Sequence, residues 1–343
     1  MTKIDVIHIG VTTAGWYPID RLAALAADLM GGEARSILAH QPSALEKLTS
    51  LMRRPKGNDD KGLLVIARGP HDLHASLLPP ELMRHYGFMI AWVIDGFRHE
   101  DIPAGWRMGP YDLLAVTRPN DEEIYRRISG KPVIVLNWGT DALGLGSAAT
   151  DRTVDVLRLG RQPPAWDDDD RSARVCADHG LSFSGRPPFF DNPLENHAAL
   201  MRCVGQVRYV IAHSNLAAPA HYTHPTQDYI TARWTDALAA GAVVAGIPPD
   251  QDRSVDLLWP EALLTFDAID LTANVQRLVQ ARANWTDRIP LLNHRMALAR
   301  LDWRWRLKAL VDQLGIDAPK LTGEMSRITA RLEALDAQLG AAV

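Results

Sequence analysis

The side chains best suited to chemistry lie around one short helix that the sequence predicts over residues 230–240. Asp228, Thr231 and Arg233 lie at its beginning, Asp236 lies about one turn further on, and Gly241 follows its end. The N-terminal end of a helix carries partial positive charge and unpaired N–H groups, which bind an anion such as a diphosphate with about 0.3–1 kcal/mol when exposed. A carboxylate at Asp236 would accept hydrogen bonds from ribose hydroxyls, as carboxylates do in dinucleotide sites. These residues therefore predict a nucleotide site.

The same stretch resembles the donor-binding signature of the group-1 type of GT-B glycosyltransferases. In that family an acidic residue, seven intervening residues and a second acidic residue precede Ala-x-Ala-x-Gly and an apolar strand. Asp228 and Asp236 have this spacing, with aspartate in place of both family glutamates, and residues 237–241 complete it. The likeness is closest to the spore-maturation-protein (CgeB-like) branch. It implies that Asp236 holds the ribose, Arg233 a donor phosphate and Asp228 the sugar. The simpler alternatives are a solvated carboxylate at Asp236 and a surface ion pair at Arg233.

A second point of likeness is the stretch 155–162, Asp-Val-Leu-Arg-Leu-Gly-Arg-Gln. The second domain of the family opens with a strand followed by Gly-Arg, whose basic residue commonly meets the donor diphosphate. The resemblance implies this role for Arg161. His213 ends the predicted strand 207–213 and is expected to line the same cleft, the alternative being that it and the two residues after it cap a turn.

The catalytic base is expected in the first half of the chain, where a carboxylate or imidazole would take the proton of an acceptor hydroxyl. His8, His71, Asp72 and Asp95 follow or end predicted strands. Asp95 is our first choice because it follows the apolar run 90–94, at the carboxyl edge of a sheet where ligands bind. A structural aspartate at a strand end is the alternative for this residue.

Short apolar runs alternate with stretches of helical periodicity along the whole chain. The first half has predicted strands 4–9, 35–39, 62–67, 88–94, 111–116 and 132–136 and predicted helices 19–30, 43–52, 80–86 and 121–128. The second half has predicted strands 154–159, 181–184, 207–213, 242–246 and 263–266 and predicted helices 168–177, 192–203, 230–240 and 270–283. Apolar strands separated by helices form parallel sheets covered on both faces. The pattern predicts an α/β protein of two Rossmann-like, doubly wound domains facing a cleft (GT-B), with C-terminal helices.

A turn-rich stretch at 137–147 contains glycine and serine residues of the kind found at domain boundaries. We expect an acceptor domain over residues 1–145, a nucleotide-sugar donor domain over 150–290, and C-terminal helices over 291–343. The last helix carries an apolar stripe from Met325 to Leu339. Such a stripe packs on its own chain more often than it forms a homodimer seam, and both alternatives stay open.

Composition restricts the class of protein. Of the 343 residues 47% are hydrophobic and 23% charged, which is typical of a globular protein, and the net charge of −4 gives no reason to expect nucleic acid. Two cysteines and no zinc-like spacing favour a reduced, cytoplasmic setting. No apolar run reaches the roughly 18–20 residues that span a bilayer. The acidic run 167–170 precedes a predicted helix, so N-capping explains it better than metal binding does.

These observations favour a glycosyltransferase, which transfers a sugar from a nucleotide-sugar to an acceptor hydroxyl without a cofactor or a metal. The phosphate-binding loop of ATPases, the dinucleotide fingerprint and the nucleophile elbow of hydrolases are all absent from the sequence. The acceptor would be a sugar, a lipid-linked molecule or a protein, and residues 301–308 permit peripheral membrane contact. A sugar-nucleotide epimerase and a non-catalytic nucleotide-sugar-binding scaffold are the alternatives.

Overall fold

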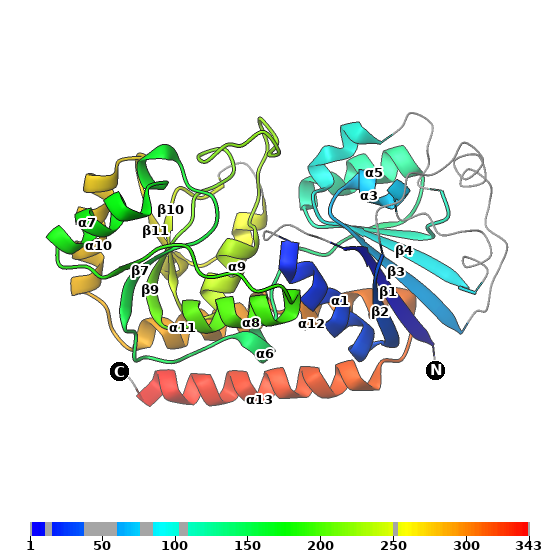
Figure 1. The fold of residues 1–343 in the computed structure, drawn as a ribbon. Helices are drawn as coiled ribbons and strands as arrows, with labels where there is room; N and C mark the ends of the chain where they lie inside the picture. The colour runs from blue at the N-terminus through cyan, green and yellow to red at the C-terminus, as the bar shows by residue number, and fades with distance from the viewer. Residues whose placement is uncertain are drawn as a thin grey trace. The chain divides into compact units, whose positions relative to one another are not determined.

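The computed structural model describes residues 2–10, 16–37, 60–75, 85–102, 109–249 and 253–341. It divides into two compact units, drawn in Figure 1. Unit 1 consists of Met1–Trp138 and Arg304–Met325, and unit 2 of Gly139–Trp303 and Ser326–Val343. The predicted helix 43–52 and most of the predicted helix 80–86 lie outside the described residues. The domain limits expected at residues 145, 150 and 290 stay predictions.

Unit 1 is built on a six-stranded sheet in the order β2-β1-β3-β4-β5-β6. Its strands pair in parallel throughout, so their carboxyl ends lie at one edge. The strands are β1 (Lys3–Ile9), β2 (Gly31–Ile37), β3 (Lys61–Ala67), β4 (Phe88–Val93), β5 (Leu113–Val116) and β6 (Val133–Val135). The helices α1 (Tyr17–Leu29), α3 (Pro70–Ala75), η2 (Gly96–Asp101), η3 (Pro119–Asp121) and α5 (Glu122–Ser129) connect them.

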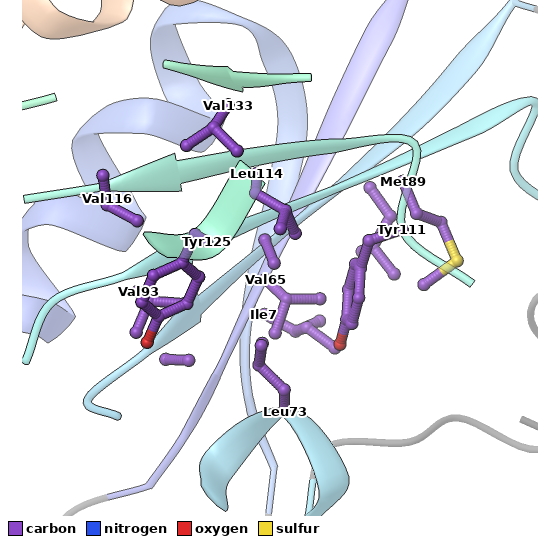
Figure 2. Packing of buried hydrophobic residues seen from close by; sticks show 13 residues of the cluster. Ile7, Val65, Leu73, Met89, Val93, Tyr111, Leu114, Val116, Tyr125 and Val133 are labelled. Carbon is purple, nitrogen blue, oxygen red and sulfur yellow. The ribbon is translucent and has the colours of Figure 1, made fainter. Parts of the chain in front are cut away.

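The core of unit 1 lies between the sheet and α3 and α5. Leu73 of α3 and Tyr125 of α5 pack with Ile7, Val65 and Val93 of the strands, as Figure 2 shows. In Figure 1, α1 lies on the opposite face of this sheet. Because both faces are covered, the central strands are apolar over nearly their whole length. In β3, for example, the six residues after Lys61 are all buried.

Unit 2 is built on a five-stranded sheet in the order β11-β10-β9-β7-β8, again parallel throughout. The strands are β7 (Val154–Arg158), β8 (Phe183–Ser184), β9 (Val207–Ile211), β10 (Val243–Gly246) and β11 (Leu263–Thr265). The helices are α6 (Ala142–Leu145), η4 (Pro164–Trp166), α7 (Asp169–Asp178), α8 (Pro193–Val204), α9 (Ala232–Ala239), η5 (Arg253–Leu257), η6 (Pro260–Ala262), α10 (Leu271–Ala283) and α11 (Arg288–Arg300).

The second core lies between this sheet and α7 and α10. Cys176 of α7 and Leu278 of α10 pack with Val156, Tyr209 and Val243 of the strands. In Figure 1, α8, α9 and α11 lie on the other face. The predicted class, α/β with two parallel-sheet domains, is confirmed in both units.

The C-terminal part differs from its prediction at one point. The periodicity predicts one long helical stretch over residues 290–314, whereas α11 ends at Arg300 and α12 (Trp303–Leu314) begins three residues later. The break depends on a tertiary contact, which the periodicity of the local sequence cannot indicate. Thr140 donates its N–H to Leu301 O at 2.9 Å and accepts the N–H of Trp303 at 2.9 Å, in place of helical partners.

The last helix, α13 (Pro319–Ala341), begins in unit 1 and ends in unit 2. Three residues of its predicted apolar stripe, Ile328, Leu335 and Leu339, are buried within this chain. Packing on the same chain and a homodimer seam both stay predictions.

The second strand also differs from its prediction. The expected strand 35–39 is β2, which begins at Gly31, directly after α1. It is one of the two edge strands of the sheet and most of its side chains are exposed, so its sequence lacks the apolar run that marks the central strands.

Candidate nucleotide-binding site

The predicted donor residues gather at the carboxyl edge of the sheet of unit 2. Arg161 follows β7, His213 follows β9, and Arg233 lies in the first turn of α9, the helix before β10. Because these strands are parallel, the loops after them meet at one edge, where open α/β sheets bind their ligands. Gly160 has a φ of +69° and lets the side chain of Arg233 lie close to the backbone after β7. A Cβ there would lie 2.7 Å from Arg233 Cδ, so only glycine fits without displacing the arginine.

Arg161 and Arg233 share one neutral acceptor. The Nη2 of Arg161 and the Nη2 of Arg233 both donate to Asn215 Oδ1, at 2.8 and 3.1 Å. Arg161 Nε donates to Ala218 O. Arg233 donates to Arg161 O at 3.2 Å and, over a long 3.4 Å, to Thr231 Oγ1. All of these acceptors are uncharged.

No carboxylate forms an ion pair with either arginine among the residues that the structure describes. Burial and, after it, the neighbouring charge of Arg161 lower the pKa of Arg233 from 12.5 to about 10, so that it remains a cation at pH 7. Other arginines of this chain are neutralised, as Arg158 is by Asp167 and Asp169 at 2.5 and 3.0 Å. The pair Arg161–Arg233 therefore presents positive charge that no ion pair of the described residues neutralises, and the more distant charge of Asp228 offsets only part of it.

The short helix α9 begins at Ala232, directly before Arg233 of the pair Arg161–Arg233. Its N-cap residue, Thr231, makes no side-chain capping hydrogen bond, and Arg233 is its second residue. The partial positive charge of the helix N-terminus adds to that of the two guanidinium groups. An anion is the ligand that this arrangement favours.

His213 lies beside the pair but is fully buried. Its Nδ1 accepts the N–H of Ile247 at 3.3 Å, which puts the proton of the neutral ring on Nε2. That Nε2 has no hydrogen-bond partner among the described residues. Burial and the charge of Arg233 lower the pKa of His213 from 6.5 to about 4, so the ring is neutral at pH 7. Its predicted place near the cleft stays a prediction, and the turn after it is capped by Ser214 Oγ, which accepts Ala217 N–H at 3.1 Å.

Asp228 and Asp236 both point into protein. Asp228 is 2% exposed, and its Oδ2 accepts the N–H of Leu216 at 3.3 Å, which fixes the loop before α9. Asp236 is 1% exposed. Its Oδ1 accepts the hydroxyl of Thr140 at 2.6 Å and its Oδ2 lies 3.1 Å from His197 Nε2. Because protein groups occupy both oxygens, neither is presented to a ribose in this structure, and the expected sugar and ribose contacts stay predictions.

The candidate bases lie in unit 1 at the carboxyl edge of its sheet. Asp95, two residues after the end of β4, is partly exposed. His8 is 4% exposed, with Nδ1 3.2 Å from Ile9 O and Nε2 3.5 Å from Asp20 Oδ1, so both ring nitrogens face protein. Of these two residues, Asp95 is the more exposed.

The remaining candidates, His71 and Asp72, form a pair on α3. Asp72 is 2% exposed and accepts two hydrogen bonds from the Arg68 guanidinium, at 2.7 and 2.8 Å. His71 Nε2 lies 3.2 Å from Asp72 Oδ1, and the histidine side chain is 53% exposed. Despite its burial, the hydrogen bonds from His71 and Arg68 lower the pKa of Asp72 to about 2. The carboxylate is therefore charged at pH 7 and fixes the orientation of both neighbours.

The acidic run 167–170 has the structural role expected of it. Asp168 caps α7 by accepting the N–H of Arg171 at 2.9 Å. Asp167 and Asp169 pair with Arg158. Within the described ranges, no group of three or more His, Cys, Asp or Glu residues could hold a metal ion.

Three further residues at or near the site were not predicted. Tyr222, 56% exposed, carries its ring 5.2 Å from the Arg161 guanidinium in a cation–π contact. Thr140 and His197 hold Asp236 from segments far away in the sequence. An exposed aromatic in a loop gives a weak signal in the sequence, and buried partners of this kind give none.

A known structure resembles the chain as a whole. HepE of Anabaena, solved in complex with UDP and with UDP-glucose, matches 92% of this chain and 100% of its own, with a TM-score of 0.52 at 10% identity. The chain has the GT-B fold. The apo form of WaaB, a lipopolysaccharide outer core galactosyltransferase, matches 91% of this chain and 99% of its own at 13% identity, with a lower TM-score of 0.46. We base the assignment of the fold on HepE.

Sequence comparison adds no closer assignment. No protein-family profile matches the chain, and no curated protein matches it. The likeness to the CgeB-like branch stays a prediction. In the described part of the chain no helix combines the length and the apolar composition needed to cross a bilayer.

Proposed function

We propose that the protein is a glycosyltransferase that binds a UDP-sugar in unit 2 and transfers the sugar to an acceptor hydroxyl. The observation that carries this proposal is the pair Arg161–Arg233, which shares Asn215 Oδ1 and has no carboxylate partner among the described residues. A diphosphate supplies the missing negative charge and accepts strong, charge-assisted hydrogen bonds. The UDP and UDP-glucose complexes of HepE, a protein of the same fold, support the choice of a uridine nucleotide.

The two arginines also suit the chemical step. As the bond between the anomeric carbon and the diphosphate oxygen breaks, its electron pair leaves with UDP and negative charge grows on the diphosphate. Guanidinium groups that are already in position stabilise that charge. In this proposal they supply the positive charge that a metal ion supplies in other transferases. The acceptor oxygen forms the new bond to carbon, and its proton passes to a base, for which we propose Asp95.

Titration calorimetry with UDP tests the site. Arg161→Ala and Arg233→Ala each remove a charged donor worth about 1.5–3 kcal/mol, so each should weaken UDP binding by about 10- to 150-fold. Arg277→Ala is the matched control, because Arg277 is an arginine of the same unit that pairs with exposed Asp267 at 2.9 Å. Equal UDP affinity in all four proteins would refute the site.

Activity is measured as UDP release from a panel of UDP-sugars, with and without added acceptors. Transfer requires release that depends on the acceptor and is lost in Arg233→Ala. The same incubation without acceptor separates transfer from epimerisation, because an epimerase returns an intact, isomerised UDP-sugar.

A further inference from the structure

A buried polar network lies one turn beyond the proposed UDP site. Its centre is Asp236 of α9, held by Thr140 Oγ1 at 2.6 Å and His197 Nε2 at 3.1 Å. All three residues are at most 1% exposed. His197 lies on α8, and Thr140 is the second residue of unit 2. The network therefore joins three segments that are separate in the sequence.

Two further sets of contacts, made by Thr235 and by the backbone of Thr140, lie where the chain passes from one unit to the other. Gly139 is the first residue of unit 2, and its carbonyl accepts the hydroxyl of Thr235, also on α9, at 3.0 Å. The second crossing lies between Trp303 and Arg304. Thr140 contacts the segment before it through backbone hydrogen bonds to Leu301 and Trp303, both at 2.9 Å. A Cβ at Gly139 would lie 2.3 Å from Leu301 O, so the two crossing segments are in close contact.

The arginine of the proposed UDP site and the residues that contact the crossings belong to one short helix. Arg233 lies in the first turn of α9, and Thr235 and Asp236 follow it by two and three residues. A helix of eight residues has a length of about 12 Å, and its backbone hydrogen bonds fix these three residues relative to one another. A shift or a stiffening of its first turn therefore reaches the two crossings through Thr235 and Asp236.

We propose that Asp236, Thr140 and His197 couple nucleotide binding at the beginning of α9 to the two chain crossings at residues 138–140 and 301–304. The proposal rests on the proposed function, because UDP is the ligand that contacts Arg233. It gives Asp236 a positioning role. An aspartate fits between Thr140 and His197, whereas the extra methylene of the glutamate found in the resembling family would have to displace one of them.

The energetics favour an all-or-none arrangement. A buried carboxylate that loses either partner keeps an unsatisfied oxygen, and a buried hydroxyl or imidazole is left unpaired in turn. The three side chains therefore stay together, and a change at one of them reaches the others.

Hydrogen–deuterium exchange of the full chain, with and without UDP, tests the coupling. In the natural protein UDP should slow amide exchange in peptides that cover residues 138–141 and 300–304 as well as 232–240. The expected slowing is about 5- to 150-fold, the range of ordinary coupling between sites. In Thr140→Val and Asp236→Asn the slowing at 138–141 and 300–304 should disappear.

Asp155→Asn is the matched control. Asp155 is another buried carboxylate of unit 2, bonded to Ser182 N at 2.9 Å and to Arg208 at 2.9 Å, and it lies on β7 away from α9. This variant should lose stability and still show the full effect of UDP at both crossings. Retention of that effect in Thr140→Val and Asp236→Asn would overturn the proposal.

The two proposals fail in different ways. If the natural protein binds UDP and protects α9 but neither crossing, the coupling is wrong and the proposed function stands. If the natural protein gives no heat of UDP binding, the proposed function is wrong and the coupling falls with it.

Discussion

Replacing Arg233 with methionine should leave the ligand-free protein nearly as stable as before. The pKa of Arg233 is lowered from 12.5 to about 10 in the folded protein. The charged guanidinium therefore costs the folded state about 3 kcal/mol relative to the unfolded chain. The partial exposure of the side chain reduces this cost. Because the pKa of the folded state is lowered, the cost is present at every pH below about 10, and it disappears as the pH rises towards 12.5.

Methionine removes that cost and keeps most of the buried volume. It also removes the hydrogen bonds to Arg161 O, Asn215 Oδ1 and Thr231 Oγ1, each worth about 0.5–1.5 kcal/mol. The three bonds together contribute about 1.5–4.5 kcal/mol and oppose a cost of about 3 kcal/mol, so we expect the stability to change by no more than about 1.5 kcal/mol, or about 3–6 °C in Tm. UDP binding should weaken at least about tenfold in the same variant.

The assay combines calorimetric melting of the ligand-free protein with UDP titration. Arg304→Met is the control, since Arg304 is 4% exposed and pairs with Glu324 at 2.8 Å. Removing one partner of a buried pair costs about 3–5 kcal/mol. If Arg233→Met lowers the Tm as much as Arg304→Met does, Arg233 is a structural residue and the reasoning is refuted.

Three shorter predictions concern other residues. Gly160→Ala places a methyl group against Arg233 and should weaken UDP binding in a titration, whereas Gly180→Ala, with a similar φ of +73° and no atom within 4 Å, should lose similar stability and bind UDP normally. His213 has a lowered pKa of about 4, so its contribution to stability is complete above pH 6.5 and is lost as the pH falls towards 4. Urea unfolding at pH 7 and 4.5 should show a smaller acid loss for His213→Gln. Asp168→Ala removes the cap of α7 and should cost about 1 kcal/mol by urea unfolding, with unchanged UDP binding.

The sequence was sufficient to predict most of the architecture because parallel sheets leave a clear pattern. A run such as 62–67 is apolar throughout, since both faces of a central strand are covered. The exposed edge strand β2 lacks this pattern, and its bounds were predicted less well. The interruption between α11 and α12 could not be predicted at all. It depends on hydrogen bonds to Thr140, which is about 160 residues earlier in the chain.

The site shows the same division. Arg161 and Arg233 were each expected to contact the donor diphosphate because of the resemblance to a known family, and that contact stays a prediction. In the structure both residues donate to Asn215 Oδ1. The inward direction of Asp236 could not be predicted. Helical periodicity gives the face on which a residue lies, but whether that face is buried depends here on Thr140 and His197, 96 and 39 residues away.

The most direct test of the central claim is a crystal structure of the protein with UDP. We expect diphosphate oxygens within about 3.2 Å of the guanidinium groups of both Arg161 and Arg233, at the beginning of α9. A UDP molecule bound elsewhere on the chain, with both guanidinium groups still bonded only to protein groups, would contradict the proposal.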